Sequence, residues 1–512
     1  MRVLLVPPTF KYATNYPEFL SLSDFPSGFA YIAAALKQAG HEVFGCNPNN
    51  IVGYVDAPTM LKAVLTKRIQ EVTPELIGLG GLATDFKFLK DAIGIIRGID
   101  PKILIVLGGQ IVTNDAEDIF QLLKPDYAIC GEGERPIVEL ATLLRNEVKP
   151  WPHIWETDSG DILPIDKIPF PDYEPFGIKS LMDDFSMATR LLYRYSRPDP
   201  RPFGIVTARG CPYSCTFCID HHRGYRARSV ENVMAEIKES YEKYHFNILI
   251  ILDELFAVNK EQMREFCENI LIGKEKYGWD FDWMFQTHAN ARLDLEALQL
   301  AKKAGCMSFS YGLESASPIV LESMQKKLKV EQVVEAIKLA EEANIGFSAN
   351  LIFGDVAESA DTIAESLAFW FEYCKRAFVF LSQVAPYPGS ALFEACRQKG
   401  MFRDKKEYYE KIDQVIPNMT TIRDGTFGGL LQLIQFLEKS WLFTKTTPII
   451  KCEKSQEDGV LLTYQGGNYY NLTAKCPYCG QEIVYKERLL ETRNFWLGTG
   501  CTHCNRKIRV EG

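Results

Sequence analysis

Short apolar runs alternate with amphipathic stretches along the first 145 residues. Apolar runs suited to strands lie at 2–8, 41–46, 75–84, 102–110 and 126–134, and stretches with helical spacing lie at 28–40, 86–100 and 115–125. Strands that are apolar throughout are typical of a parallel sheet covered by helices on both faces. Their alternation with helices favours right-handed crossover connections. The pattern predicts an α/β protein whose first domain, residues 1–145, is doubly wound and Rossmann-like.

A second α/β region is predicted at residues 201–400, after a linker at 146–200. Six apolar runs occur there, at 201–211, 246–256, 282–290, 306–315, 346–355 and 377–390. Six strands are too few for a closed eight-stranded barrel, so we expect a partial (β/α)6 barrel with its chemistry at the C-terminal strand ends. Beyond it we expect a helical extension at 401–470, with its clearest helix at 427–445, and a small ribbon-like metal domain at 471–512.

Composition narrows the class of protein. The chain has 512 residues, of which 46% are hydrophobic and 24% charged, as in a folded protein with several cores. Its net charge of −9 argues against nucleic acid or an anionic membrane as the main partner. No apolar run reaches about 18 residues, so no membrane span is expected. The N-terminal run ends in two prolines and is typical of a strand, not of a signal peptide, which favours a cytoplasmic protein.

The fourteen cysteines fall into two groups. Seven lie in tight clusters, which indicates metal binding in a reducing cytoplasm and not a disulfide framework. The other seven are scattered and are expected to be plain buried thiols: Cys46, Cys130, Cys267, Cys306, Cys374, Cys396 and Cys452.

The first cluster has three cysteines, Cys211, Cys215 and Cys218, in the spacing CxxxCxxC at the end of the first predicted barrel strand. Three thiolates can hold three irons of a 4Fe–4S cluster and leave the fourth iron open to another ligand. A zinc site completed by His221 or His222 is the alternative.

The second cluster has two CxxC pairs, Cys476 with Cys479 and Cys501 with Cys504, separated by 21 residues. Two such knuckles complete a tetrahedral sulfur site, so we expect a structural zinc. An auxiliary iron–sulfur cluster is the alternative. The small domain has little core of its own, so metal should largely hold it together.

Glycine-rich strand ends in the first domain predict a ligand site. Glycines follow three of its strands, at 80–81, 108–109 and 131–133, where ligands bind in such sheets. No GxGxxG follows the first strand, so a dinucleotide is not expected. Polar residues likewise end the barrel strands, among them Asp253, Glu254, Thr287, His288, Glu314, Asp355 and Gln383.

Taken together, these features resemble the radical S-adenosylmethionine superfamily. The resemblance rests on CxxxCxxC, on Phe217 just before the third cysteine, and on the partial barrel. It implies that the open iron binds S-adenosylmethionine and that one electron cleaves it to a 5′-deoxyadenosyl radical. The LGG and GEGE turns and the stretches at 168–176, 252–256, 311–315, 323–327 and 385–390 extend the resemblance, over about residues 1–400, to the cobalamin-binding branch.

The resemblance also implies site residues. Phe217 would belong to the S-adenosylmethionine site, Asp253 and Glu254 would lie near the methionine end, and Glu314 near the ribose. Cobalamin would be cradled by Thr84, Gly108, Gly109, Gly131, Glu132 and Gly133. No DxHxxG motif is present, and His41 is most simply structural, so the lower face of cobalt would be open or face a group other than histidine.

The implied activity is cobalamin-dependent methyl transfer to an unactivated carbon, or phosphorus, of a small-molecule or peptide substrate, with flavodoxin or ferredoxin as electron donor. A radical cyclase or rearrangement enzyme without methyl transfer is an alternative. Methylthiolation is disfavoured because the N-terminal domain has no second three-cysteine cluster. An electron-transfer or metal-sensing protein is the alternative of another class.

Overall fold

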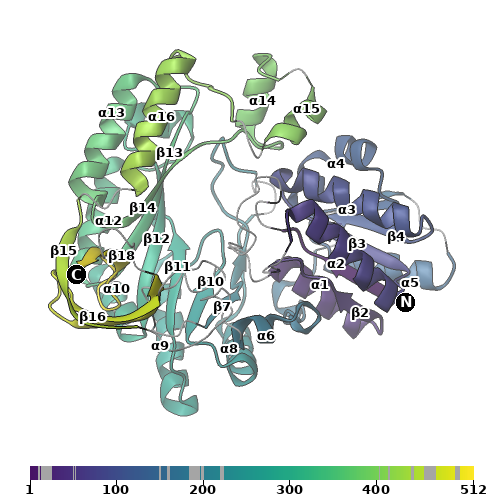
Figure 1. Ribbon diagram of the computed structural model, residues 1–512, viewed down its shortest axis with the longest axis horizontal. Helices are drawn as coiled ribbons and strands as arrows, with labels where there is room; N and C mark the ends of the chain where they lie inside the picture. Colours follow the sequence, from purple (N-terminus) through teal and green to yellow (C-terminus); the bar gives the residue numbers. More distant parts are fainter. Residues whose placement is uncertain are drawn as a thin grey trace. The chain divides into compact units, whose positions relative to one another are not determined.

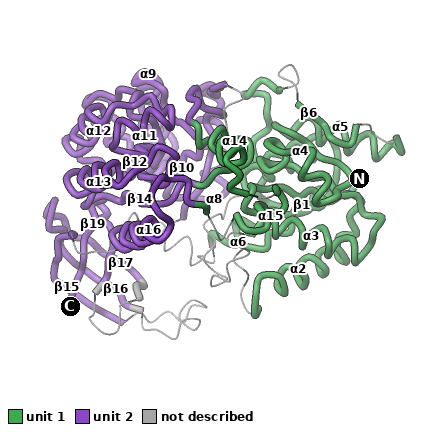
Figure 2. The backbone as a smooth tube through the Cα atoms, turned by 90° about the horizontal axis from the view of Figure 1, so that it is seen from above, with its two compact units in different colours: residues 1–188, 216–223, 385–417 green, residues 189–215, 224–384, 418–512 purple. Residues whose placement is uncertain are grey.

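The chain forms two compact units in the computed structural model (Figure 2). The first comprises Met1–Ala188, Thr216–Arg223 and Ala385–Pro417, and the second Thr189–Cys215, Gly224–Val384 and Asn418–Gly512. The structure describes residues 1–9, 12, 26–49, 51, 54–148, 152–157, 162–183, 197, 201–219, 224–402, 404–412, 416–439, 443–454, 469–489 and 496–512.

A parallel six-stranded sheet with the order β2-β1-β3-β4-β5-β6 forms the centre of the first unit (Figure 1). Its strands are β1 (Arg2–Val6), β2 (Glu42–Gly45), β3 (Leu76–Gly80), β4 (Leu104–Gly108), β5 (Tyr127–Cys130) and β6 (Ile154–Glu156). Its helices include α1 (Ser27–Gln38), α2 (Ala57–Val72), α3 (Phe86–Ile99), α4 (Gln110–Leu123), α5 (Glu134–Arg145) and α6 (Ile178–Asp183). The predicted doubly wound fold is confirmed. The apolar pattern had not indicated α2 or α5, and β6 lies within the stretch predicted to be a linker.

Burial follows the sequence pattern in this unit. All five residues of β3 are buried, as a strand covered on both faces requires. Helix α3 buries Phe86, Leu89, Ile93 and Ile96, which recur at the three- and four-residue spacing of one helical face. These side chains join one hydrophobic core with residues of β1, β3 and β4.

The segment after the last barrel strand also belongs to the first unit. It contains α14 (Ala391–Gln398) and α15 (Lys405–Lys411), and Phe393, Tyr408 and Tyr409 are buried in the core of the first unit. Tyr409 stacks on Phe86 with ring centroids 5.2 Å apart. The first unit therefore takes residues 385–417, whereas the sequence had suggested a barrel that ran to residue 400 and a separate extension after it.

The second unit contains a parallel sheet of six strands with the order β14-β13-β12-β11-β10-β7 (Figure 1). The strands are β7 (Pro202–Ile205), β10 (Ile248–Ile251), β11 (Asp282–Thr287), β12 (Cys306–Glu314), β13 (Gly346–Phe353) and β14 (Phe378–Gln383). The helices between them include α8 (Val230–Tyr244), α9 (Lys260–Tyr277), α10 (Leu295–Lys303), α11 (Pro318–Ser323), α12 (Val330–Glu342) and α13 (Ala360–Phe369). The predicted six-stranded partial barrel is confirmed.

A five-stranded sheet closes the chain, after α16 (Asp424–Lys439). Its order is β17-β16-β15-β19-β18, with β15 (Lys445–Lys454), β16 (Tyr469–Lys475), β17 (Glu482–Leu489), β18 (Trp496–Gly500) and β19 (Lys507–Glu511). The ribbon sheet thus begins at Lys445, inside the stretch predicted to be helical. Of the predicted helix at 427–445, residues 440–442 lie outside the described residues.

Among the helices that the structure describes, none is both long enough and apolar enough to span a bilayer.

Candidate functional site

The cysteine cluster follows the first barrel strand in a loop with a narrow neck. At the neck, β8 (Ala208–Arg209) pairs antiparallel with β9 (Arg226–Ala227). Gly210 has φ +80°, and a Cβ built on it would lie 2.1 Å from the carbonyl oxygen of Gly224. Only glycine therefore allows the two sides of the neck to approach this closely. We call residues 210–225 the cysteine loop, of which the structure describes 210–219 and 224–225.

Asp253 anchors the chain that leads into the cysteine loop. Its Oδ1 accepts a hydrogen bond of 2.6 Å from the Thr207 amide, and its Oδ2 accepts one of 2.5 Å from the Thr207 hydroxyl. Burial raises the pKa of Asp253 to about 7, although the hydrogen bonds from Thr207 oppose the shift. The structure thus shows Asp253 in a positioning role, while its predicted place near S-adenosylmethionine stays a prediction.

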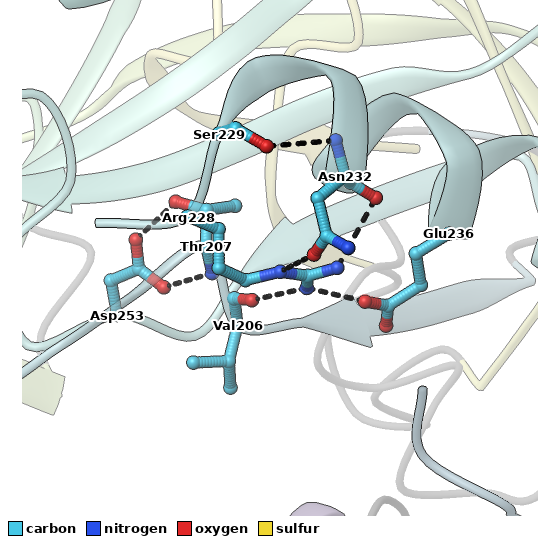
Figure 3. A network of polar contacts seen from close by, with 7 residues as sticks. All are labelled: Val206, Thr207, Arg228, Ser229, Asn232, Glu236 and Asp253. Carbon is cyan, nitrogen blue, oxygen red and sulfur yellow. Dashed lines mark hydrogen bonds and ion pairs between the residues drawn. The ribbon is translucent and has the colours of Figure 1, made fainter. Parts of the chain in front are cut away.

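Arg228, which follows β9, contacts Val206 and Thr207, which precede β8, and so joins the two sides of the neck (Figure 3). Its guanidinium donates to the carbonyl oxygen of Val206 at 2.8 Å and to the Asn232 side chain at 2.7 Å, and it pairs with Glu236. Its amide donates to the carbonyl oxygen of Thr207 at 2.9 Å. The side chains of Arg228 and Glu236 are only 5% and 1% exposed, so this is a buried ion pair whose partners depend on each other.

The C-terminal end of β11 supports the middle of the cysteine loop. The ring of Tyr213 stacks on His288, with centroids 4.2 Å apart and planes 22° apart. Burial and the Lys326 ammonium lower the pKa of His288 to about 4, so the imidazole is neutral near pH 7. Its Nδ1 accepts a hydrogen bond of 3.2 Å from the Asn290 amide. The sequence had marked His288 only as one of several polar residues at strand ends.

The three cysteines suit an iron–sulfur cluster. Cys215 is buried, Cys211 and Cys218 are half-buried, and no disulfide engages any of them. Three thiols from one loop are the donor set for a 4Fe–4S cluster with one iron left to another ligand. Phe217 is half-buried in a turn of the same loop. His221 and His222, the ligands of the alternative zinc site, lie outside the described residues.

Glu314, the residue predicted to lie near the ribose, forms a buried ion pair with Lys326. Glu314 Oε1 lies 2.9 Å from Lys326 Nζ, and both side chains are about nine-tenths buried. Burial alone would lower the pKa of Lys326, but Glu314 and the nearby Cys215 and Cys211 together raise it, so the ammonium stays charged. Lys326 is therefore a cation beside the cysteines that the sequence analysis had not singled out.

The backbone is shaped around this pair. A Cβ on Gly312 would lie 2.6 Å from Glu314 Oε1 and 2.9 Å from Lys326 Nζ, so glycine leaves room for the two charged groups. Glu314 itself has φ +62°, a conformation that residues other than glycine rarely adopt. Two short stretches, 311–315 and 323–327, thus meet in one ion pair.

Glu254 offers an exposed carboxylate at the mouth of the cysteine loop. Its Oε2 accepts a hydrogen bond of 3.2 Å from the amide of Gly210, the first residue of the loop. Unlike Asp253, the side chain is open to solvent. It therefore lies where a carboxylate could accept a bond from an ammonium group of a ligand.

Loops at the C-terminal strand ends of the first unit pack tightly against one another. A Cβ on Gly109, which has φ +85°, would lie 2.7 Å from the amide nitrogen of Gly81. The Thr113 hydroxyl donates to the carbonyl oxygen of Gly109 at 3.0 Å and accepts from the Gly131 amide at 2.9 Å. Thr113, on α4, thus ties together the ends of β4 and β5.

The same edge of the sheet carries small side chains and is partly apolar. A Cβ on Gly108 would meet nothing nearer than 3.8 Å, and Leu82 is 50% exposed beside the half-buried Thr84. Glu132 and Gly133 are half-buried beyond β5. A surface of glycines and short side chains fits the broad face of a corrin ring.

Among the described residues, the histidines of the first unit lie at the opposite edge of the sheet. His41 directly precedes β2, and its Nε2 lies 3.4 Å from the Thr142 hydroxyl. His153 directly precedes β6, and its Nδ1 lies 2.8 Å from the carbonyl oxygen of Asp126. Neither can reach a ligand at the C-terminal strand ends, which agrees with the structural role expected for His41.

The four ribbon cysteines meet in one cluster. Their sulfur atoms all lie within 4.8 Å of one another, with Cys476 3.8 Å from Cys504 and Cys479 3.7 Å from Cys501. Among the described residues this is the one group of three or more metal-ligating side chains gathered so closely.

Two family models match the chain. The radical SAM superfamily model matches residues 205–369, which include the barrel strands β10 to β13 and the cysteine loop. The B12 binding domain model matches residues 25–141, which lie in the first unit.

Two curated proteins match this chain over most of its length. An uncharacterized methyltransferase, PH0819, of Pyrococcus horikoshii is 25% identical over 77% of this chain and 83% of its own. The anaerobic magnesium-protoporphyrin IX monomethyl ester cyclase of Cereibacter sphaeroides is 24% identical over 86% of this chain and 71% of its own.

Among solved structures, the radical S-adenosylmethionine methyltransferase TsrM of Kitasatospora setae, with cobalamin and a 4Fe–4S cluster bound, has the same fold. It matches with a TM-score of 0.60 at 17% identity, over 78% of each chain. The barrel with its cysteine loop, the doubly wound unit and the matches to both family models together place the chain in the cobalamin-binding-domain-containing family of radical S-adenosylmethionine enzymes.

Proposed function

We propose that the protein is a cobalamin-dependent radical S-adenosylmethionine methyltransferase that acts on an unactivated carbon or phosphorus. The observation that carries the proposal is the union, in one chain, of a cysteine loop at the end of a barrel strand and a B12-binding unit. When bound, the cluster, S-adenosylmethionine and cobalamin would supply a radical source and a methyl carrier.

The residues of this chain would position and insulate these groups. Cys211, Cys215 and Cys218 would bind the cluster, and Asp253 and Arg228 hold the chain on either side of the loop neck. Glu254 would accept a hydrogen bond from the ammonium group of S-adenosylmethionine, because its carboxylate is exposed beside Gly210. The strand ends at Thr84, Gly108 to Gly109 and Gly131 to Gly133 would hold cobalamin.

Lys326 would set the charge next to the cluster. Because it is buried and paired with Glu314, its ammonium cannot move away, and it stays protonated. A fixed cation near the thiolates offsets part of their negative charge and favours the electron-rich state. Radical chemistry of this superfamily requires a one-electron reductant. We expect flavodoxin or ferredoxin in that role, and a small molecule or peptide as the substrate.

The proposal is tested by anaerobic turnover of the cluster- and cobalamin-loaded enzyme with its substrate and methyl-labelled S-adenosylmethionine. We expect equal formation of 5′-deoxyadenosine and S-adenosylhomocysteine, with the label on the product. The matched control replaces Cys211, Cys215 and Cys218 with Ala. It should form no 5′-deoxyadenosine and keep the metal of the ribbon.

A radical cyclase is the second candidate, because a cyclase is among the similar proteins at nearly the same identity as the methyltransferase. In that case the substrate would be converted, with 5′-deoxyadenosine formed and no label transferred. Conversion without label would overturn the methyltransferase proposal. Absence of any S-adenosylmethionine cleavage by loaded enzyme would overturn both candidates and leave the electron-transfer or metal-sensing alternative.

A further inference from the structure

The second ribbon knuckle lies against the N-terminal ends of three barrel strands. Asn505, next to Cys504, donates from Nδ2 to the carbonyl oxygen of Met307 at the start of β12. The Lys507 amide donates to the carbonyl oxygen of Arg376, just before β14, at 3.0 Å. Lys302, at the end of α10, donates to the carbonyl oxygen of His503 at 3.1 Å. We call these three hydrogen bonds the basal contact.

The backbone of both partners is adapted to this contact. Asn505 is 3% exposed and has φ +53°. A Cβ on Gly346, the first residue of β13, would lie 2.2 Å from the Cβ of Asn505, so the strand must begin with glycine for the knuckle to fit. Such close backbone approach is typical of a permanent packing surface and not of a passing encounter.

A buried lysine extends the same surface. The ammonium of Lys507 lies 5.5 Å from the ring centre of Phe378, the first residue of β14, and burial lowers its pKa. Lys507 begins β19, which pairs with both β15 and β18. The basal contact is therefore continuous with the ribbon sheet as well as with the metal knuckle.

The geometry of the four sulfur atoms fits one tetrahedral metal ion and not a multi-iron cluster. A zinc ion with Zn–S bonds of about 2.3 Å places its sulfur ligands about 3.8 Å apart, along the edges of a tetrahedron. The two measured separations are 3.8 and 3.7 Å. A 4Fe–4S cluster binds each cysteine to a different iron, so its cysteine sulfur atoms lie farther apart. Here all four sulfur atoms lie within 4.8 Å of one another.

The surrounding amides also suit a single ion. The Tyr478 amide donates to Cys476 Sγ at 3.4 Å, and the His503 amide donates to Cys501 Sγ at 3.3 Å. These hydrogen bonds reduce the charge on two thiolates.

We infer that a single structural Zn²⁺ in the ribbon holds the second knuckle against the N-terminal ends of β12, β13 and β14. The order of these strand ends then depends on the bound ion. The site lies at the starts of β12 to β14, whereas the cysteine loop follows the end of β7. The nine residues of β12 alone span about 26 Å. In barrels, the N-terminal face serves stability and the opposite face serves chemistry, which assigns the ribbon ion to stability.

Metal content and hydrogen exchange of the full chain test the inference. Protein in which Cys211, Cys215 and Cys218 are replaced with Ala should retain one zinc per chain and no sulfide. A Cys504→Ser variant, or wild type treated with a strong zinc chelator, should lose that zinc. Amides at the starts of β12, β13 and β14 should then exchange at least tenfold faster, while those of the first unit keep their rates.

A second variant separates the docking from the metal. Asn505→Gly keeps the backbone conformation, because glycine readily adopts φ +53°, and removes the side chain that contacts β12 and β13. It should retain zinc and still speed exchange at the starts of β12 and β13. Val484→Ala, at an exposed position on β17, should change neither quantity. Iron bound in preference to zinc, or unchanged exchange in both the zinc-free protein and Asn505→Gly, would overturn the inference.

Discussion

The two buried charged residues next to the cysteines, Lys326 and Glu314, are stabilised by each other and not by solvent. Lys326 and Glu314 are both buried and in contact, so neither can lose its partner and be rescued by water. Removing one partner of such a pair costs about 3–5 kcal/mol, because it leaves an uncompensated buried charge. Replacing both partners with neutral groups costs much less.

We therefore expect Lys326→Met to lower the free energy of unfolding of the second unit by about 3 kcal/mol. The double variant Lys326→Met with Glu314→Gln should recover most of that loss. Urea unfolding of the apo protein, followed by tryptophan fluorescence, measures both. A single variant as stable as wild type would show that the pair is not buried in solution.

A second carboxyl group predicts a pH dependence. Glu358 is 1% exposed, and its Oε2 accepts a hydrogen bond of 2.5 Å from the Gly354 amide. Burial raises its pKa to about 7, with a further increase from Asp355. The folded state thus holds this proton more tightly than the unfolded state. Protonated Glu358 makes its full contribution to stability below the pKa of this side chain in the unfolded state, near 4.5. That contribution is lost as the pH rises towards 7, the pKa in the folded state.

We expect Glu358→Gln to flatten this decline. The free energy of unfolding of the variant should rise relative to that of wild type between pH 5 and pH 7, by up to about 1.4 kcal/mol per pH unit. Above pH 7 the variant should remain the more stable of the two. Unfolding midpoints measured across this range provide the comparison. A difference between the two proteins that is the same at pH 5 and pH 8 would exclude a proton bound at Glu358.

At the scale of elements, the neck of the cysteine loop joins β7, β9 and α8 through one polar network. The ion pair of Arg228 and Glu236 lies at its centre and is buried. The same helix also carries an exposed pair, Lys238 with Glu242 at 2.7 Å, with side chains 42% and 62% exposed. Exposed pairs contribute about 0–1 kcal/mol, so Glu236 and Glu242, both on α8, make a matched comparison.

We expect Glu236→Gln to loosen the neck and reduce retention of the iron–sulfur cluster severalfold during anaerobic gel filtration. Glu242→Gln should retain iron as wild type does. Iron and sulfide per chain, together with the electron paramagnetic resonance of the reduced cluster, are the measurements. Equal iron in the two variants would mean that the neck does not position the cluster.

The pattern of apolar positions predicted the six strands of the barrel sheet and five of the six strands of the first sheet, and the cysteine spacing predicted the ribbon cluster, because local periodicity and spacing encode these features. The contacts that individual site residues make could not be predicted in this way. Glu314 meets Lys326 only because its backbone adopts φ +62°, and Asp253 faces Thr207 only because β7 and β10 are neighbours. Such contacts are set by the tertiary fold and leave no periodic signal.

At the scale of the whole molecule, the chain leaves its first unit and returns to it. Residues 385–417 come back from the barrel to complete the first unit, and nothing in their apolar pattern names the core that receives them. Lys405 pairs with Asp115 at 2.8 Å, and the Tyr409 hydroxyl donates to the same carboxylate at 2.9 Å. Asp115 sits at a non-helical position within α4, so the returning segment is fastened to an irregular turn.

A fragment that ends at residue 188 should therefore be incomplete. We expect it to bind an apolar dye and to melt well below a fusion in which residues 385–417 follow it through a flexible linker, because Phe393, Tyr408 and Tyr409 would be missing from its core. Calorimetry and dye fluorescence compare the two. Identical melting of both fragments would contradict the packing of this segment.

This return of the chain imposes an order in time on the newly made protein. At a synthesis rate of about 5–20 residues per second, roughly 10–40 s pass between the emergence of Ala188 and that of Ala385. Throughout that interval the aromatic side chains that finish the first core do not yet exist. The core of the B12-binding unit therefore stays incomplete, with part of its apolar surface exposed to solvent, until the barrel has been synthesised. During this interval the exposed apolar surface of the first unit is open to aggregation.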